Sequence, residues 1–258
     1  QVNPVYFRSG ASAVMNGKPI ALFLDYDGTL TPIVSRPQDA RISEEMRTAV
    51  RELSRKVTVA VVSGRMREDV QELVGVENIF YAGSHGFDIA GPDFRMVHPD
   101  AEHAVSLVTR LVEESRRDLG DIDGILVEEK KFSLALHYRL VDEDKYLGRI
   151  RTYARQLVAD NPGLRLMEGR KVFEILPDID WNKGMAVRWI MDALHMRWET
   201  VSAVYIGDDT TDEDAFRVLR TRGTGILVTA EPRASAAHFL VHDPDDVLAL
   251  FRKILAAA

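Results

Sequence analysis

Residues 25–29, Asp-Tyr-Asp-Gly-Thr, contain two aspartates whose type and spacing are well suited to catalysis or metal binding. A carboxylate can act as a nucleophile, as an acid or base, or as a ligand of a hard cation. The pair follows an apolar run at 20–24, which is short, bounded by polar residues and therefore typical of a strand buried on both faces. Open α/β folds bind ligands beyond the carboxyl ends of their strands, and both carboxylates point the same way if the extended backbone persists to Asp27. Solvated acids in an Asp-Gly turn would give the same pattern, but an EF-hand is excluded because no acidic ligand follows at the required spacing.

The composition is that of an ordinary globular protein. The chain has 258 residues, of which 46% are hydrophobic and 28% are charged, and its formal net charge is −7. No basic patch is visible, so we expect no nucleic-acid partner, and an anionic substrate would need local positive charge or a metal. There is no cysteine, no charged-then-apolar signal pattern and no apolar run of the ~20 residues that a membrane helix needs. We therefore expect a cytoplasmic monomer that does not bind membranes.

The first part of the chain alternates strands and helices. After an irregular lead-in at 1–19 and the strand at 20–24, residues 31–41 are expected to form a loop and 42–55 a helix. Strands at 57–62 and 79–82 end in the glycine-containing loops Ser63-Gly64-Arg65 and Gly83-Ser84-His85-Gly86. Alternating strands and helices predict a parallel sheet with helices on both faces.

Near residue 100 the pattern changes. The sequence here predicts the order helix–strand–strand twice: a helix at 101–117, strands at 124–129 and 132–139, a helix at 142–159, and strands at 164–168 and 170–176. This predicts an antiparallel α+β unit inserted into the parallel domain. One sheet face should be apolar, with Phe132, Leu134 and Leu136, and the other polar, with His137, Arg139, Arg170 and Glu174. A solvated outer face would explain the polar side chains equally well.

The parallel pattern then resumes. A helix should begin near Lys183, a buried strand at 202–206 leads into an acidic run at 207–214, and further strands are expected at 224–229 and 238–241. Thr211 with Asp214 fits a helix-capping pattern, Glu213 and Asp214 suit a helix N-terminus, and Asp243-Pro244 should cap a last helix at 244–255. The expected domains are 1–100 with 180–258, and an insertion at 101–179.

The strand ends carry Asp25 and Asp27, Ser63, Lys183 at a helix start, and Asp208 with Asp212. In this order they resemble the four motifs of the haloacid dehalogenase-like phosphotransferases. The chain further resembles one family of that superfamily, the trehalose-6-phosphate phosphatases. The resemblance extends to residues 25–33, 62–65, 81–86, 137–139, 169–175, 180–184 and 207–214. It implies a Rossmann-like parallel-sheet core with an inserted cap of the αββαββ, or C2, type.

The sequence departs from the family at Leu176-Pro177, where Arg-Pro is frequent. No synthase-like region is present, so we expect a free-standing phosphatase.

The resemblance also assigns roles to residues. Asp25 would attack phosphorus and form an aspartyl-phosphate, Asp27 would serve as acid and then base, and Lys183 and Ser63 would stabilise the transferring group. Mg²⁺ would be bound by Asp25, the backbone carbonyl of Asp27 and Asp208, with Asp212 supporting the site. The sugar would be bound by Glu128, Arg139, Arg170 and Glu174 of the cap, with Arg65 and His85 as further candidates on core loops.

Three functions remain open from the sequence. The first is hydrolysis of trehalose 6-phosphate by a Mg²⁺-dependent enzyme whose cap closes over the sugar. The second is action on another sugar phosphate, such as sucrose phosphate, mannosyl-phosphoglycerate or a hexose-phosphate mutase substrate, because the core motifs do not separate these. The third is a non-catalytic sugar-phosphate sensor, although a sensor would be free to lose Asp25 or Asp27 and both are present.

Overall fold

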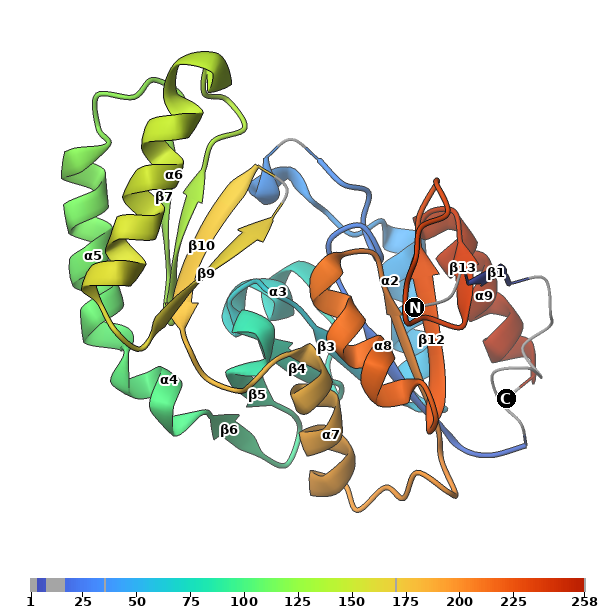
Figure 1. Ribbon diagram of the computed structural model, residues 1–258. Helices are drawn as coiled ribbons and strands as arrows, with labels where there is room; N and C mark the ends of the chain where they lie inside the picture. The colour runs from blue at the N-terminus through green and yellow to red at the C-terminus, as the bar shows by residue number, and fades with distance from the viewer. Residues whose placement is uncertain (1–3, 8–16, 35, 170, 258) are drawn as a thin grey trace. The chain divides into compact units, whose positions relative to one another are not determined.

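The computed structural model describes residues 4–7, 17–34, 36–169 and 171–257. The chain divides into two compact units (Figure 1). Unit 1 combines 1–96 with 181–258, and unit 2 spans 97–180. Among the described residues, no helix is both long enough and apolar enough to cross a membrane.

Unit 1 is built on one mixed sheet. Its strand order is β1-β13-β12-β11-β2-β3-β4-β5-β6, and every pairing from β1 through β4 is parallel, whereas β5 runs antiparallel to β4. The predicted parallel sheet is thus confirmed. The strands are β1 (Val5–Tyr6), β2 (Ile20–Leu24), β3 (Thr58–Val62), β4 (Phe80–Gly83), β5 (Asp88–Ala90), β6 (Arg95–Val97), β11 (Ser202–Gly207), β12 (Gly223–Val228) and β13 (Phe239–Val241).

Helices cover both faces of this sheet, as predicted. In β2, Leu22 and Leu24 pack with helices α2, α3 and α9, while Ala21 and Phe23 pack on the opposite face with α7 and α8. This alternation follows from the two-residue period of a strand, and it explains why β2 is apolar throughout. The helices are α2 (Glu44–Ser54), α3 (Arg67–Val74), α7 (Lys183–Ala193), α8 (Glu213–Leu219) and α9 (Pro244–Ala257).

Several local expectations were wrong. The described part of the lead-in is not wholly irregular, because β1 pairs with β13, whereas residues 1–3 and 8–16 lie outside the described residues. The hairpin of β5 and β6 was missed, since three-residue strands give too short a pattern to recognise. The helix at 101–117 is two helices, α4 (Pro99–His103) and α5 (Val105–Asp118). The capping box before α8 uses Asp209 and Asp212 around the 3₁₀ helix η3 (Thr210–Asp212), not Thr211 with Asp214.

Unit 2 is an antiparallel sheet with two long helices on one face. The strand order is β7-β8-β10-β9, and helices α5 and α6 pack on the face that carries Leu134, Leu136, Phe173 and Ile175. The other face carries Ser133, Glu174 and His137, as the alternation predicts. The remaining elements are β7 (Leu126–Lys130), β8 (Ser133–His137), α6 (Glu143–Asp160), β9 (Leu164–Gly169) and β10 (Val172–Pro177).

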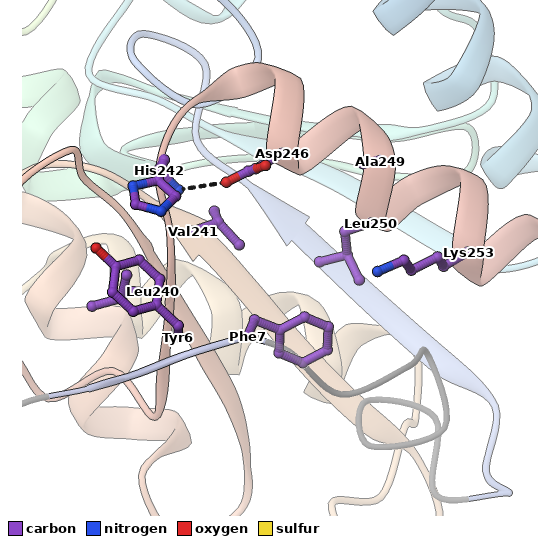
Figure 2. Close-up of a pocket in the computed structure, with 9 residues that line it drawn as sticks. All are labelled: Tyr6, Phe7, Leu240, Val241, His242, Asp246, Ala249, Leu250 and Lys253. Atoms are coloured by element: carbon purple, nitrogen blue, oxygen red, sulfur yellow. Dashed lines mark hydrogen bonds between the residues drawn. The ribbon is translucent and has the colours of Figure 1, made fainter.

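A pocket of about 390 Å³ lies among β1, β13 and α9 (Figure 2). Its walls are mainly apolar, and the backbone N–H of His242 donates a 2.9 Å hydrogen bond to Asp246 at its rim. None of the candidate site residues lines it. It is formed by Tyr6, Phe7, Leu240, Val241, His242, Asp246, Ala249, Leu250 and Lys253.

Candidate active site

The order of the sheet brings the candidate residues of unit 1 to one edge. Strands β11, β2, β3 and β4 are neighbours and parallel, so their carboxyl ends lie side by side. Asp208, Asp25 and Ser63 follow three of these strands directly, and His85 follows the fourth within the 3₁₀ helix η2 (Ser84–Gly86). The sheet itself therefore gathers residues that are up to 183 positions apart in the chain.

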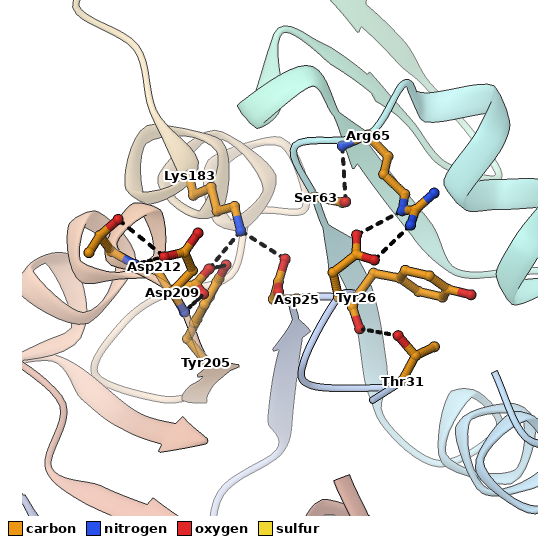
Figure 3. Close-up of polar contacts among 11 residues, drawn as sticks. Asp25, Tyr26, Thr31, Ser63, Arg65, Lys183, Tyr205, Asp209 and Asp212 are labelled. Carbon is orange, nitrogen blue, oxygen red and sulfur yellow. Dashed lines mark hydrogen bonds and ion pairs between the residues drawn. The ribbon is translucent and has the colours of Figure 1, made fainter. Parts of the chain in front are cut away.

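Lys183 is the centre of the buried polar contacts (Figure 3). Its ammonium donates to Oδ1 of Asp25 at 2.8 Å and to Oδ1 of Asp212 at 2.7 Å. The Lys183 side chain is 3% exposed, and those of Asp25 and Asp212 are 6% and 0% exposed. A buried charge needs partners of opposite sign, and these contacts show that Lys183 is not a surface lysine.

Burial and the neighbouring charges determine the pKa values of Asp25 and Lys183. Burial raises the pKa of Asp25 well above its ordinary value; the Lys183 ammonium opposes this rise, while Asp212 and Asp208 add to it. Burial alone would lower the pKa of Lys183, but the charges and hydrogen bonds of Asp212 and Asp25 outweigh it and raise that pKa. Lys183 is therefore a fixed positive charge beside Asp25.

Three carboxylates here could hold a metal ion. Asp25, Asp208 and Asp212 each offer an oxygen, and these oxygens all lie within 4.8 Å of one another. When all three are ionised, the carboxylates exceed the one ammonium by two negative charges, which one divalent cation would balance. All-oxygen ligands suit hard cations such as Mg²⁺, so the donor set fits. The carboxylate of Asp27 pairs with the guanidinium of Arg65. In this arrangement, the backbone carbonyl of Asp27 is the group that it could offer to the same ion.

Gly28 adjoins this cluster. Its φ is +82°, and a Cβ at this position would lie 2.3 Å from Oδ2 of Asp208. We expect Gly28→Ala to displace the Asp208 carboxylate and to weaken divalent-cation binding at least about tenfold, which corresponds to about 1.4 kcal/mol. Isothermal titration calorimetry with Mg²⁺ measures this.

The matched control is Gly163→Ala. Gly163 has φ +97°, but an added Cβ there has nothing within 4 Å. This variant therefore carries the backbone strain of a left-handed alanine without the clash. Equal losses of cation affinity in both variants would contradict the role given to Gly28.

Asp27 makes a separate contact. The guanidinium of Arg65 donates from Nε and Nη2 to the two carboxylate oxygens of Asp27, both at 2.7 Å. Strand β2 ends at Leu24, so the extended backbone does not persist to Asp27, and the two aspartates of the pair have different cationic partners. A bidentate pair of this kind fixes the carboxylate in direction as well as in place.

Ser63 and His85 lie in the loops beside this pair. The Ser63 hydroxyl is buried and accepts a 3.1 Å hydrogen bond from the backbone N–H of Arg65, and the Ser63 carbonyl accepts one of 2.9 Å from the backbone N–H of His85. His85 is buried with φ +57°, and its ring lies where a Cβ on Gly64 would stand. Both residues thus shape the loop that carries Arg65.

The candidate sugar-binding residues belong to unit 2. The Glu174 carboxylate is buried and accepts hydrogen bonds from the Ser133 hydroxyl at 2.6 Å and from the Lys130 ammonium at 3.3 Å. Glu128 lies 2.7 Å from Nε2 of His137. Burial acts to raise the pKa of Glu128, but the His137 hydrogen bond and the Lys130 charge outweigh it and lower that pKa.

Two further sugar ligands were predicted in this unit, Arg139 and Arg170. Arg139 lies just beyond β8 and is exposed. Arg170 lies outside the described residues.

Two residues that contact the acidic loop were not predicted from the sequence. The Tyr205 hydroxyl donates to Asp212 at 2.6 Å. Arg233 donates to Oε1 of Glu213 at 2.8 Å and to the backbone carbonyl of Asp208 at 3.2 Å, and the second Glu213 oxygen accepts from Ala236 N–H. Glu213 is thus a buried anchor, beyond the dipole role expected for it. A tyrosine within an apolar strand was the available signal for Tyr205, whereas Arg233 is an ordinary loop residue in the sequence.

A parallel sheet that gathers an aspartate pair, a buried lysine and a further acidic loop at one edge defines the class of haloacid dehalogenase-like hydrolases. Residues 23–245 match the family model described as trehalose-phosphatase. The chain belongs to the trehalose-phosphatase family.

Curated relatives agree over most of the chain. It is 41% identical to "Probable trehalose-phosphate phosphatase 3" of Oryza sativa subsp. japonica, over 97% of this chain and 73% of the relative. It is also 41% identical to "Trehalose 6-phosphate phosphatase RA3" of Zea mays, over 94% of this chain and 71% of the relative. Among solved structures, the C-terminal domain of the trehalose-6-phosphate phosphatase of C. albicans is similar with a TM-score of 0.81 and 24% identity, covering 99% of this chain and 98% of that one. This last likeness concerns the fold.

Proposed function

We propose that the protein hydrolyses trehalose 6-phosphate to trehalose and phosphate through an aspartyl-phosphate on Asp25, with Mg²⁺ as cofactor. The observation that carries this proposal is the buried contact of Lys183 with Asp25 and Asp212, at 2.8 and 2.7 Å, in a chain of the trehalose-phosphatase family. Relatives named as trehalose 6-phosphate phosphatases support the choice of substrate.

The first step forms one bond and breaks another. An oxygen of Asp25 attacks phosphorus, and the bond between phosphorus and the sugar oxygen breaks. Lys183, held beside Asp25, offsets the negative charge that otherwise repels the phosphate dianion. A bound Mg²⁺ would supply further positive charge to the transferring phosphoryl group.

Asp27 is proposed to handle the protons. It gives a proton to the departing sugar oxygen and later takes one from the water that hydrolyses the phospho-enzyme. Both oxygens of Asp27 accept hydrogen bonds from Arg65, so the proton that Asp27 donates must occupy a lone pair that the guanidinium does not use. The contact supports a role for Arg65 in aiming Asp27, while its sugar-binding role remains a prediction.

The polar face of the unit 2 sheet is proposed to bind the sugar hydroxyls. Its charged groups, Glu128, Lys130 and Glu174, are held by neighbours on the same sheet. Charged side chains that are already ordered lose less entropy when they bind a ligand. Carboxylates accept hydrogen bonds and ammonium groups donate them, so this face can pair with both functions of a hydroxyl.

We expect Glu174→Gln to raise KM for trehalose 6-phosphate about tenfold, or about 1.4 kcal/mol, with little change in kcat. The physical reason is that the variant removes the negative charge that holds the Lys130 ammonium. Hydrolysis of p-nitrophenyl phosphate, which has no sugar, should not change. The matched control is Glu129→Gln, because Glu129 bonds to Thr109 on the helix-bearing face. A loss of kcat with both substrates would argue against a sugar-binding role for Glu174.

The test of the function is phosphate release across a panel of sugar phosphates, with wild type and Asp25→Asn. Trehalose 6-phosphate should give the highest kcat/KM, and Asp25→Asn should lower kcat for phosphate release by about four orders of magnitude. A preference for sucrose phosphate or mannosyl-phosphoglycerate would replace the substrate and keep the chemistry. Tight binding of trehalose 6-phosphate without phosphate release would show a sensor instead.

A further inference from the structure

Tyr205 is a buried ionisable residue that the proposed reaction does not use. It lies in the central strand β11, its side chain is fully buried, and its hydroxyl donates to Oδ1 of Asp212 at 2.6 Å (Figure 3). The same oxygen accepts the Lys183 ammonium at 2.7 Å, and Oδ2 of Asp212 accepts the backbone N–H of Asp209 at 2.9 Å. Asp212 is therefore held by three donors on three different segments.

The tyrosine ring itself has little freedom. It meets the ring of Phe216 edge-on, with centroids 5.7 Å apart and an interplanar angle of 86°. On the neighbouring strands, Phe23 and Gly225 lie opposite Tyr205 in register. Burial and the nearby carboxylates raise the pKa of Tyr205 well above its ordinary value, so the phenol stays a neutral donor.

The position of the hydroxyl matters because Lys183 is shared. One ammonium serves Asp212 and Asp25, and only the contact with Asp25 faces the proposed nucleophile. A hydrogen bond from Tyr205 offsets part of the charge on Asp212 and fixes the direction of that carboxylate. Electrostatic interactions are strong in a buried site. Without the hydrogen bond from Tyr205, the Asp212 carboxylate would therefore attract the Lys183 ammonium more strongly, and the ammonium would move away from Asp25.

We propose that Tyr205 is a positioning residue for Lys183: its hydroxyl holds Asp212 so that the ammonium stays within hydrogen-bond reach of Asp25. The proposal rests on the proposed function, since it assigns the lysine–aspartate contact to phosphoryl transfer. The proposal predicts that loss of the hydroxyl lowers the rate of the chemical step and leaves sugar binding unchanged. The reason is that Tyr205 is fully buried and its hydroxyl contacts Asp212.

The test is Tyr205→Phe, which removes the hydroxyl and keeps the ring. The matched control is Tyr81→Phe on β4, where a buried phenol donates to the backbone carbonyl of Val76 at 2.7 Å and touches none of the acidic cluster. We expect both variants to lose similar thermal stability. Only Tyr205→Phe should lower kcat, by about tenfold, with KM for trehalose 6-phosphate unchanged within a factor of two.

A crystal structure of Tyr205→Phe supplies a readout that does not depend on turnover. The distance from the Lys183 ammonium to Asp25 should lengthen beyond hydrogen-bond reach, about 3.2 Å, while the distance to Asp212 should not. Unchanged kcat, equal losses of kcat in both variants, or an unmoved Lys183 would overturn the proposal. If the wild type released no phosphate from any substrate, the proposed function would fail, and the crystallographic readout would still decide the role of Tyr205.

Discussion

Replacing Asp25 with asparagine should lower kcat for phosphate release by about four orders of magnitude, a loss of the size seen when an essential group is removed from an enzyme. An amide is a poor nucleophile, so no covalent bond to phosphorus forms. The variant should still fold. Burial raises the pKa of Asp25, which means that its charged form is disfavoured there, and the neutral amide avoids this penalty while Lys183 keeps Asp212.

Steady-state kinetics and thermal unfolding of the same preparation separate these effects. Asp209→Asn is the matched control, because it also removes one negative charge near the acidic cluster, and asparagine can replace aspartate as the cap of the 3₁₀ turn. It should keep kcat within about threefold, an effect of less than about 1 kcal/mol. If Asp25→Asn retained measurable turnover at a tenth of wild type, Asp25 would not be the nucleophile.

The sequence was sufficient where a residue's position follows from the end of a strand. Asp25, Ser63 and Asp208 directly follow buried apolar runs, and parallel strands bring such ends to one edge of a sheet. Both faces of β8 were predictable for the same reason, because side chains alternate along a strand. These inferences need only local periodicity and the topology that alternating elements impose.

The sequence was insufficient where a contact depends on side-chain direction or on a distant loop. The bidentate contact of Arg65 with Asp27 joins residues 38 positions apart and depends on β2 ending before Asp27. The contact of Arg233 with the carbonyl of Asp208 depends on the path of the loop after β12. Local pattern carries no information on either. Strands of two or three residues, such as β1, are set by the neighbours they pair with.

The second large effect is expected for Lys183→Met. Methionine has a similar length but no charge, so Asp25 and Asp212 lose their shared ammonium. Removing an electrostatic group that stabilises a transition state typically costs 10² to 10³ in kcat, and we expect a loss of roughly this size. Breaking a buried ion pair from one side destabilises proteins by about 3–5 kcal/mol, so the free energy of unfolding should fall by a similar amount.

The pH dependence of that loss provides a sharper test. Burial already raises the pKa of Asp25 above its ordinary value of 3.8, and removing Lys183 removes the largest opposing influence. A carboxyl group whose pKa is raised in the folded state favours folding where it is protonated, and this contribution is lost as the pH rises through the folded-state pKa. In the presence of EDTA, the stability deficit of Lys183→Met relative to wild type should therefore shrink as the pH falls from about 8 toward 5.

Lys56→Met, which removes an exposed lysine with one hydrogen bond to Leu255, should cost less than about 0.5 kcal/mol at every pH. A deficit for Lys183→Met that stayed constant or grew on acidification would mean that the ammonium does not offset the charge of Asp25.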